Sequence, residues 1–173
     1  MKIKATLIVL VLFAGTLYSQ SIQSPSEFLG YEIGARFTRH HKVVAYFKYV
    51  STALKNVKLE KYGETNEHRP LYVTYISSQE NIINLENIRK ENISQTGIIA
   101  GNTTNKKAIV WLSYNVHGNE ASSTEAAMLT LYELVTNKKA WLENTLVILD
   151  PCINPDGRDR YVNWFNQVKS APY

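Results

Sequence analysis

The sequence predicts an α/β fold with a mixed, largely parallel central sheet flanked by helices and incomplete at its C-terminal end. Two apolar runs, Ala108–Tyr114 and Thr145–Asp150, have the length and nearly unbroken hydrophobicity of strands buried on both faces. Between them, Ala121–Thr136 carries its apolar residues on one helical stripe. A strand, a helix and a strand of these lengths form a βαβ unit, so the two strands are expected to be parallel.

The first residues have the pattern of a secretory signal peptide. The basic stretch MKIK precedes an apolar run, Ala5–Gly15, which is shorter than the ~20 apolar residues that a membrane span needs. Small or polar residues follow, so cleavage is expected near Ser19 or Gln20, and residues 1–20 are assigned to the signal peptide. An uncleaved N-terminal anchor is the alternative. We therefore expect a secreted or periplasmic protein with no membrane span after signal cleavage.

The composition is that of an ordinary globular domain. Of 173 residues, 45% are hydrophobic and 20% are charged, which is enough chain for one domain with a sizeable core. The net charge of +4 comes from scattered lysines and arginines, and this argues against nucleic acid as a partner. Cys152 is the single cysteine, so no internal disulfide can form. Nothing in the pattern indicates an oligomeric state.

Local signals predict further elements upstream of the βαβ unit. One is a long helix, because Val43, Phe47 and Val50 recur on one helical face. Two β-rich runs follow it, and we expect them to pair antiparallel. The predicted elements are a short helix beginning at Ser24 and Pro25, a helix over Thr38–Leu54 with Thr38 as N-cap, strands over Val57–Gly63 and Arg69–Ser77, a helix over Ser78–Ile93, and a loop over Ala100–Lys107.

The stretch HGNE follows the first strand of the βαβ unit and places two potential metal ligands three residues apart. On a loop that turns into a helix, the imidazole of His117 and the carboxylate of Glu120 can point to the same side and share one ion. Gly118 lets the backbone turn tightly between them. The alternative is a surface histidine and a glutamate in the first helical turn, where a carboxylate complements the helix dipole. The spacing alone leaves both interpretations open.

A second polar stretch, NPDG, follows the second strand of the βαβ unit. Asn-Pro and Asp-Gly both favour turns, so Asn154–Gly157 is predicted to be a plain turn. Ligands of open α/β sheets gather at the carboxyl ends of parallel strands. The turn is therefore expected to lie beside the HGNE loop at the same edge of the sheet.

The combination of HGNE with INPDGRDRY one βαβ unit later resembles the zinc carboxypeptidases of the carboxypeptidase A and B type. The segments YEIGARFTRHHKVVAYFKYV, YGETNEHRPLYVTYISS and NIINLENIRKENI look like the start of the exported bacterial branch. The resemblance implies that residues 21–173 are the N-terminal part of the catalytic domain. It also implies Zn2+ as cofactor, His117 and Glu120 as the first two zinc ligands, and a peptide or protein substrate. The Asn154–Gly157 turn would be structural and lie beside the substrate cleft.

The resemblance also implies residues that this chain does not supply. The family's third ligand, a histidine, its general-base glutamate, and the asparagine and arginine that bind the substrate carboxylate are all expected downstream. No catalytic or substrate-binding residue is therefore assigned here, and the chain is predicted to be an inactive fragment. His40 and His41 lie on an N-terminal helix, where the third ligand is not expected, and Arg158 and Arg160 are expected at the surface or rim.

Two alternative functions stay open at this point. One is a zinc-dependent deacylase of N-acyl amino acids on the same fold, since this sequence also resembles such enzymes at the HGNE stretch. The other is a non-catalytic exported binding domain that keeps the fold without the chemistry. A downstream histidine, an Asn-Arg pair and a late glutamate would favour the peptidase.

Overall fold

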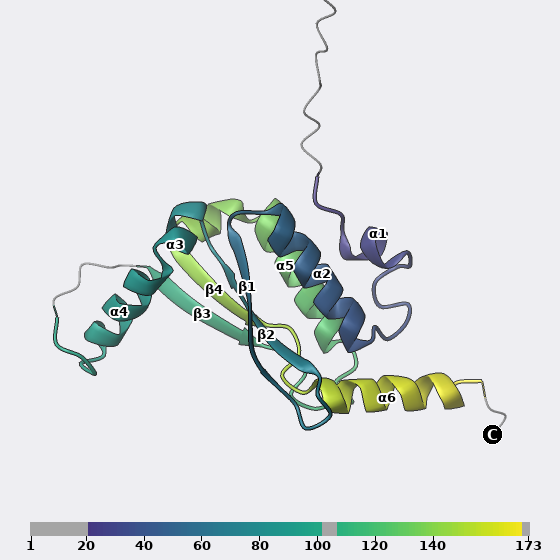
Figure 1. The fold of residues 1–173 in the computed structure, drawn as a ribbon. Coiled ribbons are helices and arrows are strands. Elements are labelled where there is room, and N and C mark those ends of the chain that lie inside the picture. Colours follow the sequence, from purple (N-terminus) through teal and green to yellow (C-terminus); the bar gives the residue numbers. More distant parts are fainter. Residues whose placement is uncertain (1–20, 102–106, 171–173) are drawn as a thin grey trace, which may run out of the picture.

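The computed structural model describes residues 21–101 and 107–170 (Figure 1). The predicted signal peptide, residues 1–20, lies outside the described residues, and so do residues 102–106 of the predicted loop. In the two described segments, no helix is long and apolar enough to cross a membrane.

The centre of the fold is a four-stranded mixed sheet. Its strands are β1 (Val57–Glu64), β2 (Pro70–Ile76), β3 (Ala108–Ser113) and β4 (Thr145–Asp150), in the order β1-β2-β4-β3. The predicted antiparallel pairing of β1 with β2 and the predicted parallel pairing of β3 with β4 are both confirmed. Because β2 also pairs antiparallel with β4, the sheet is mixed as predicted, but only one of its three pairings is parallel.

Helices flank this sheet, which confirms the predicted α/β class. They are α1 (Pro25–Leu29), α2 (His40–Ala53), α3 (Gln79–Ile83), α4 (Leu85–Gln95), α5 (Ser123–Thr136) and α6 (Pro155–Val168), with a 3-10 turn, η1 (Lys139–Glu143), before β4. Helices α2 and α5 lie side by side over one face of the sheet (Figure 1). The core forms between them and the sheet, where Phe47, Leu131 and Leu149 are fully buried.

Two helices differ from the prediction in the residues at which they begin or end. The helix predicted over Ser78–Ile93 is divided at Asn84 into α3 and α4. Helix α2 begins at His40 with Arg39 as its N-cap, so the prediction of Thr38 as N-cap is wrong. The backbone N–H of Thr38 instead donates to the side chain of Glu125, 2.5 Å away, and a tertiary contact has replaced the local cap.

The prediction of a plain turn at Asn154–Gly157 is also wrong, because these residues open helix α6. The side chain of Asn154 accepts a hydrogen bond from the backbone N–H of Gly157 at 3.0 Å, and Pro155 occupies the first helical turn. Both are start signals of a helix, since an asparagine N-cap satisfies an unpaired N–H and proline needs no donor there. The same residues that favour a turn therefore also favour a helix start.

Strand β3 differs from the prediction of a strand buried on both faces. It is the outer strand of the sheet, and Trp111 is 69% exposed. Within residues 21–101 and 107–170, no other strand pairs with the free edge of β3. Strand β4, which lies between β2 and β3, is largely buried as predicted.

Candidate metal centre

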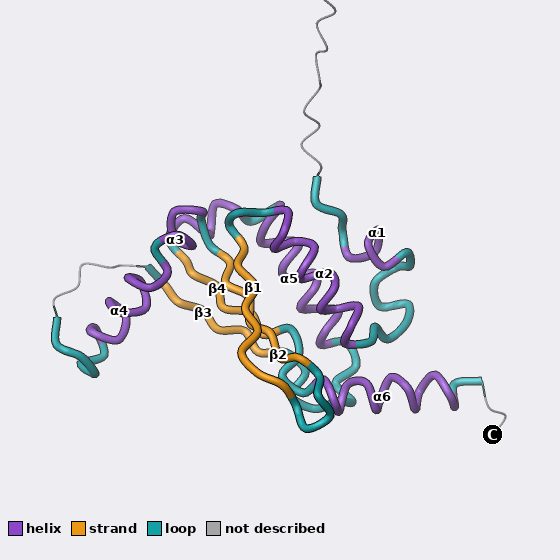
Figure 2. The backbone as a smooth tube through the Cα atoms, in the orientation of Figure 1, coloured by secondary structure: helices purple, strands orange, loops and turns teal. Residues whose placement is uncertain are grey.

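The loops that follow β3 and β4 meet at one edge of the sheet, next to the start of α6 (Figure 2). The backbone N–H of Ile153 donates to the carbonyl of Tyr114 at 3.1 Å, and the side-chain amide of Asn154 donates to the carbonyl of Val116 at 3.0 Å. The predicted adjacency of the HGNE and NPDG stretches is thus confirmed. It follows from the parallel register of the two strands, which brings both carboxyl ends to the same edge.

His117 and Glu120 lie side by side at this edge. The ring Nδ1 of His117 is 2.8 Å from Oε1 of Glu120, and the backbone N–H of His117 donates to Oε2 of the same carboxylate at 3.0 Å. These hydrogen bonds hold the pKa of Glu120 below its ordinary value, the backbone one most strongly. Because α5 begins at Ser123, Glu120 precedes the helix, and the alternative of a carboxylate in the first helical turn is wrong.

The arrangement of these two side chains suits a shared metal ion. Two ligands bound to zinc at about 2.1 Å with tetrahedral angles lie about 3.4 Å apart, so a small rotation of either side chain would admit the ion. The side chains of His117 and Glu120 are 72% and 47% exposed, which leaves their donor atoms accessible. Within the described residues, no group of three or more His, Cys, Asp or Glu side chains is placed to hold a metal. That part of the chain therefore brings together two side chains of a type that can bind a metal, His117 and Glu120.

Gly118 has a different role from the one predicted. The backbone does turn at Gly118, since the N–H of Glu120 donates to the carbonyl of His117 at 3.1 Å, but the φ angle of Gly118 is not positive, so the turn itself does not require glycine. A Cβ atom added at Gly118 would lie 2.1 Å from the carbonyl oxygen of Gly157, which no real contact allows. The glycine is required because the backbone of the HGNE loop packs directly against the first turn of α6.

The expectation that Arg158 lies at the surface or rim is wrong. Its side chain is fully buried and faces the carboxylate of Glu125, with NH2 to Oε1 and Oε2 distances of 2.7 and 2.8 Å. Its NH1 also donates to the carbonyl of Ala121, which directly follows Glu120. Arg160 is exposed as predicted and pairs with Glu67. Arg158 faces inward because it lies on the buried stripe of α6 with Pro155 and Val162, which the prediction of a turn at Asn154–Gly157 does not include.

A family model of zinc carboxypeptidases matches residues 43–169, which is most of the chain and includes both loops. The chain belongs to the zinc carboxypeptidase family. The resemblance of HGNE and INPDGRDRY to this family is thereby confirmed.

Solved structures of carboxypeptidases share the fold of this zinc carboxypeptidase chain. The carboxypeptidase A of Helicoverpa armigera superposes with a TM-score of 0.54 at 19% identity, over 70% of this chain and 25% of that chain. Thrombin activatable fibrinolysis inhibitor superposes with a TM-score of 0.55 at 14% identity, over 80% of this chain and 32% of that one. The chain thus spans about a quarter to a third of the length of these relatives.

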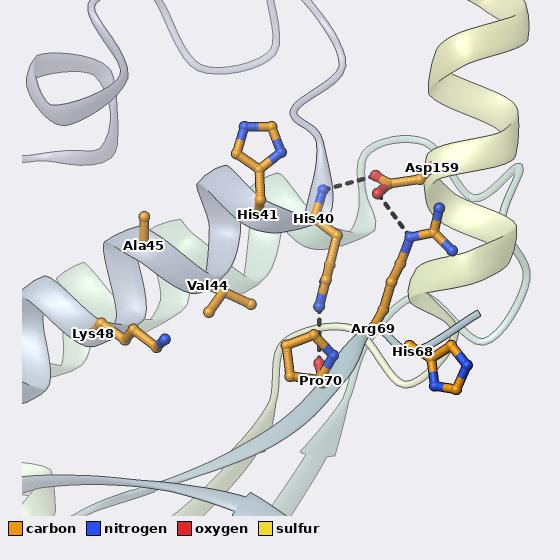
Figure 3. Close-up of a pocket in the computed structure, with 9 residues that line it drawn as sticks. All are labelled: His40, His41, Val44, Ala45, Lys48, His68, Arg69, Pro70 and Asp159. Atoms are coloured by element: carbon orange, nitrogen blue, oxygen red, sulfur yellow. Dashed lines mark hydrogen bonds and ion pairs between the residues drawn. The ribbon is translucent and has the colours of Figure 1, made fainter. Parts of the chain in front are cut away.

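The zinc carboxypeptidase chain also has a pocket of about 430 Å³ between α2, the start of β2 and α6 (Figure 3). Figure 3 shows Asp159 between the backbone N–H of His40 and the guanidinium of Arg69, at 2.9 and 3.1 Å. Nε2 of His40 lies 3.0 Å from the carbonyl of Pro70, and burial lowers the pKa of His40. These contacts fasten α6 to α2 and β2, which is a structural role for His40.

The close approach of Gly118 to α6 predicts a stability effect. We expect Gly118→Ala to lower the free energy of unfolding by about 1–3 kcal/mol, because the added methyl group must push the loop away from Gly157. Urea denaturation measures the change. Gly63→Ala is the matched control, since its Cβ would lie 3.8 Å from Leu71 in an ordinary contact. Equal stability of the Gly118 variant and the wild type would contradict the packing described.

Proposed function

We propose that His117 and Glu120 are two zinc ligands of a metallocarboxypeptidase that removes C-terminal residues from peptides or proteins. One observation carries the proposal. The imidazole and the carboxylate lie 2.8 Å apart, exposed, at the carboxyl edge of a parallel strand pair, in a chain that matches the zinc carboxypeptidase model. His and Glu are both frequent ligands of catalytic zinc.

Each residue at this edge would have a defined task. When bound, zinc lowers the pKa of water and polarises a peptide carbonyl. His117 would hold it through a ring nitrogen, and Glu120 through its carboxylate, which also accepts the backbone N–H of His117. Asn154 holds the carbonyl of Val116 and so fixes the residue before His117.

The remaining parts of the reaction need groups that the described residues do not bring to the site. Catalytic zinc takes three protein ligands in most enzymes, and proton transfer needs a general base. We propose that the third ligand, the general base and the carboxylate-binding residues belong to a region that the relatives contain and this chain does not span. The chain alone would then bind zinc weakly and lack peptidase activity.

The match to the zinc carboxypeptidase model over residues 43–169 supports the peptidase over the deacylase of N-acyl amino acids. A non-catalytic binding domain would keep the fold but would not need an imidazole and a carboxylate side by side at this edge of the sheet. The paired geometry of His117 and Glu120 supports a metal-binding role over that alternative.

Zinc titration of the purified chain tests the proposed ligands. We expect weak, saturable binding of one Zn2+, and a loss of at least about tenfold in affinity in both His117→Ala and Glu120→Gln, because each removes one of two ligands. Removal of zinc with a chelator is expected to leave the melting temperature nearly unchanged, since two exposed ligands add little folding energy.

His41→Ala is the matched control for this titration, because His41 is exposed on α2, outside the HGNE loop. It should bind zinc like the wild type. Unchanged affinity in both ligand variants would contradict the assignment, and tight stoichiometric binding by the wild type would show that a third ligand exists within the chain.

We also propose that the chain is exported and that residues 1–20 are cleaved. The basic start and the short apolar run support cleavage over anchoring. After expression in a Gram-negative bacterium with a C-terminal epitope tag, the protein should appear in the periplasm or medium. N-terminal sequencing is expected to begin near Ser21. An intact N-terminus in the cytosolic fraction would contradict export.

A further inference from the structure

The guanidinium of Arg158 is the most heavily bonded side chain around the candidate metal centre. The residue is fully buried, and each of its three nitrogens has a partner. Nε donates to the carbonyl of Thr38 at 3.1 Å, NH1 donates to the carbonyl of Ala121, and NH2 donates to both carboxylate oxygens of Glu125. A planar fork of this kind fixes three groups in one geometry, which a lysine cannot do.

Glu125 completes the arrangement from the first turn of α5. Its Oε1 accepts the backbone N–H of Thr38 at 2.5 Å, and its Oε2 accepts the hydroxyl of Thr124 at 3.0 Å. The ion pair thus connects the segment before α2, the start of α5 and the second turn of α6. Each nitrogen of the Arg158 guanidinium and each oxygen of the Glu125 carboxylate has a hydrogen-bond partner, as buried charges require.

Stability alone does not account for such a pair. Replacing a buried ion pair with apolar residues of similar volume is often neutral or stabilising, because desolvation of both charges offsets their attraction. What an apolar pair cannot supply is the set of directional bonds to the carbonyls of Thr38 and Ala121. Those bonds are therefore the distinctive contribution of Arg158.

The bond to Ala121 matters because of where that residue lies. Ala121 directly follows Glu120, whereas Val116, which directly precedes His117, is held by Asn154. Asn154 is the N-cap of α6, and Arg158 is the fourth residue of that helix. Gly157, which lies between these two residues in the sequence, packs against Gly118. The loop from Val116 to Ala121 is thus held at both ends by one rigid helix start.

We propose that Arg158 and Glu125 are positioning residues of the metal centre, which hold the HGNE loop so that His117 and Glu120 face one ion. The zinc part of this inference rests on the proposed function, whereas the restraint on the loop does not. Without the pair, the two ligands would remain in the chain but would sample many relative positions, and zinc would have to order them on binding. Partners bonded directly to zinc ligands contribute about 10- to 100-fold to affinity, and since Arg158 acts through the neighbouring Ala121, we expect an effect at the lower end of this range.

The test separates loop restraint from stability with two variants. Arg158→Lys keeps the charge but cannot reach Thr38, Ala121 and Glu125 together. The double variant Arg158→Met with Glu125→Met keeps the apolar volume and removes both charges. In each, we expect zinc affinity to fall about tenfold, and the backbone amides of His117, Glu120 and Ser123 to exchange hydrogen at least about tenfold faster. Those amides are hydrogen-bonded in the wild type.

Asn81→Ala is the matched control, because Asn81 is a buried polar residue bonded to Leu142 and Glu143, away from the loop. Its melting temperature should fall, with zinc affinity and loop exchange unchanged. Wild-type exchange and affinity in a folded Arg158→Lys variant would overturn the proposal, and so would equal changes in Asn81→Ala. If the wild type binds no zinc, the proposed function fails, while the exchange rates still decide whether the pair restrains the loop.

Discussion

The buried ion pair between Arg158 and Glu125 is the contact on which the arrangement of this edge of the fold depends. It joins three segments that are far apart in the sequence: the residues before α2, the start of α5 and the start of α6. A buried charge must be matched by partners in defined places, so the pair tolerates few alternative geometries. Its position explains why Thr38 does not cap α2 and why the HGNE loop has a definite path.

The parts of the fold that were predictable from sequence are those set by local periodicity. The apolar stripe on α5 and the two apolar runs around it were enough to predict a parallel β3–β4 pair. From that pairing alone, His117 and Asn154 could be placed at one edge of the sheet, and the hydrogen bond from Asn154 to Val116 confirms this. The spacing of His117 and Glu120 left two interpretations open, and the turn closed by the hydrogen bond from the N–H of Glu120 to the carbonyl of His117 is what brings their side chains together.

The parts that sequence could not predict depend on contacts between distant segments. The burial of Arg158 required a partner, Glu125, thirty-three positions earlier, and no local pattern links the two. The start of α6 is not predictable from these four residues, because Asn-Pro and Asp-Gly favour both a turn and a helix start, and only the following residues decide between them. An apolar run such as β3 favours a strand buried on both faces, but local pattern does not determine which faces other segments pack against, and Trp111 is 69% exposed.

The central claim is that His117 and Glu120 bind one zinc ion at this edge of the sheet. Anomalous diffraction at the zinc absorption edge, from crystals of the chain grown with Zn2+, tests it most directly because it locates the ion. We expect one peak, about 2.0–2.2 Å from a ring nitrogen of His117 and from a carboxylate oxygen of Glu120. A peak in the pocket beside His40 and His68, with none at His117, would contradict the claim.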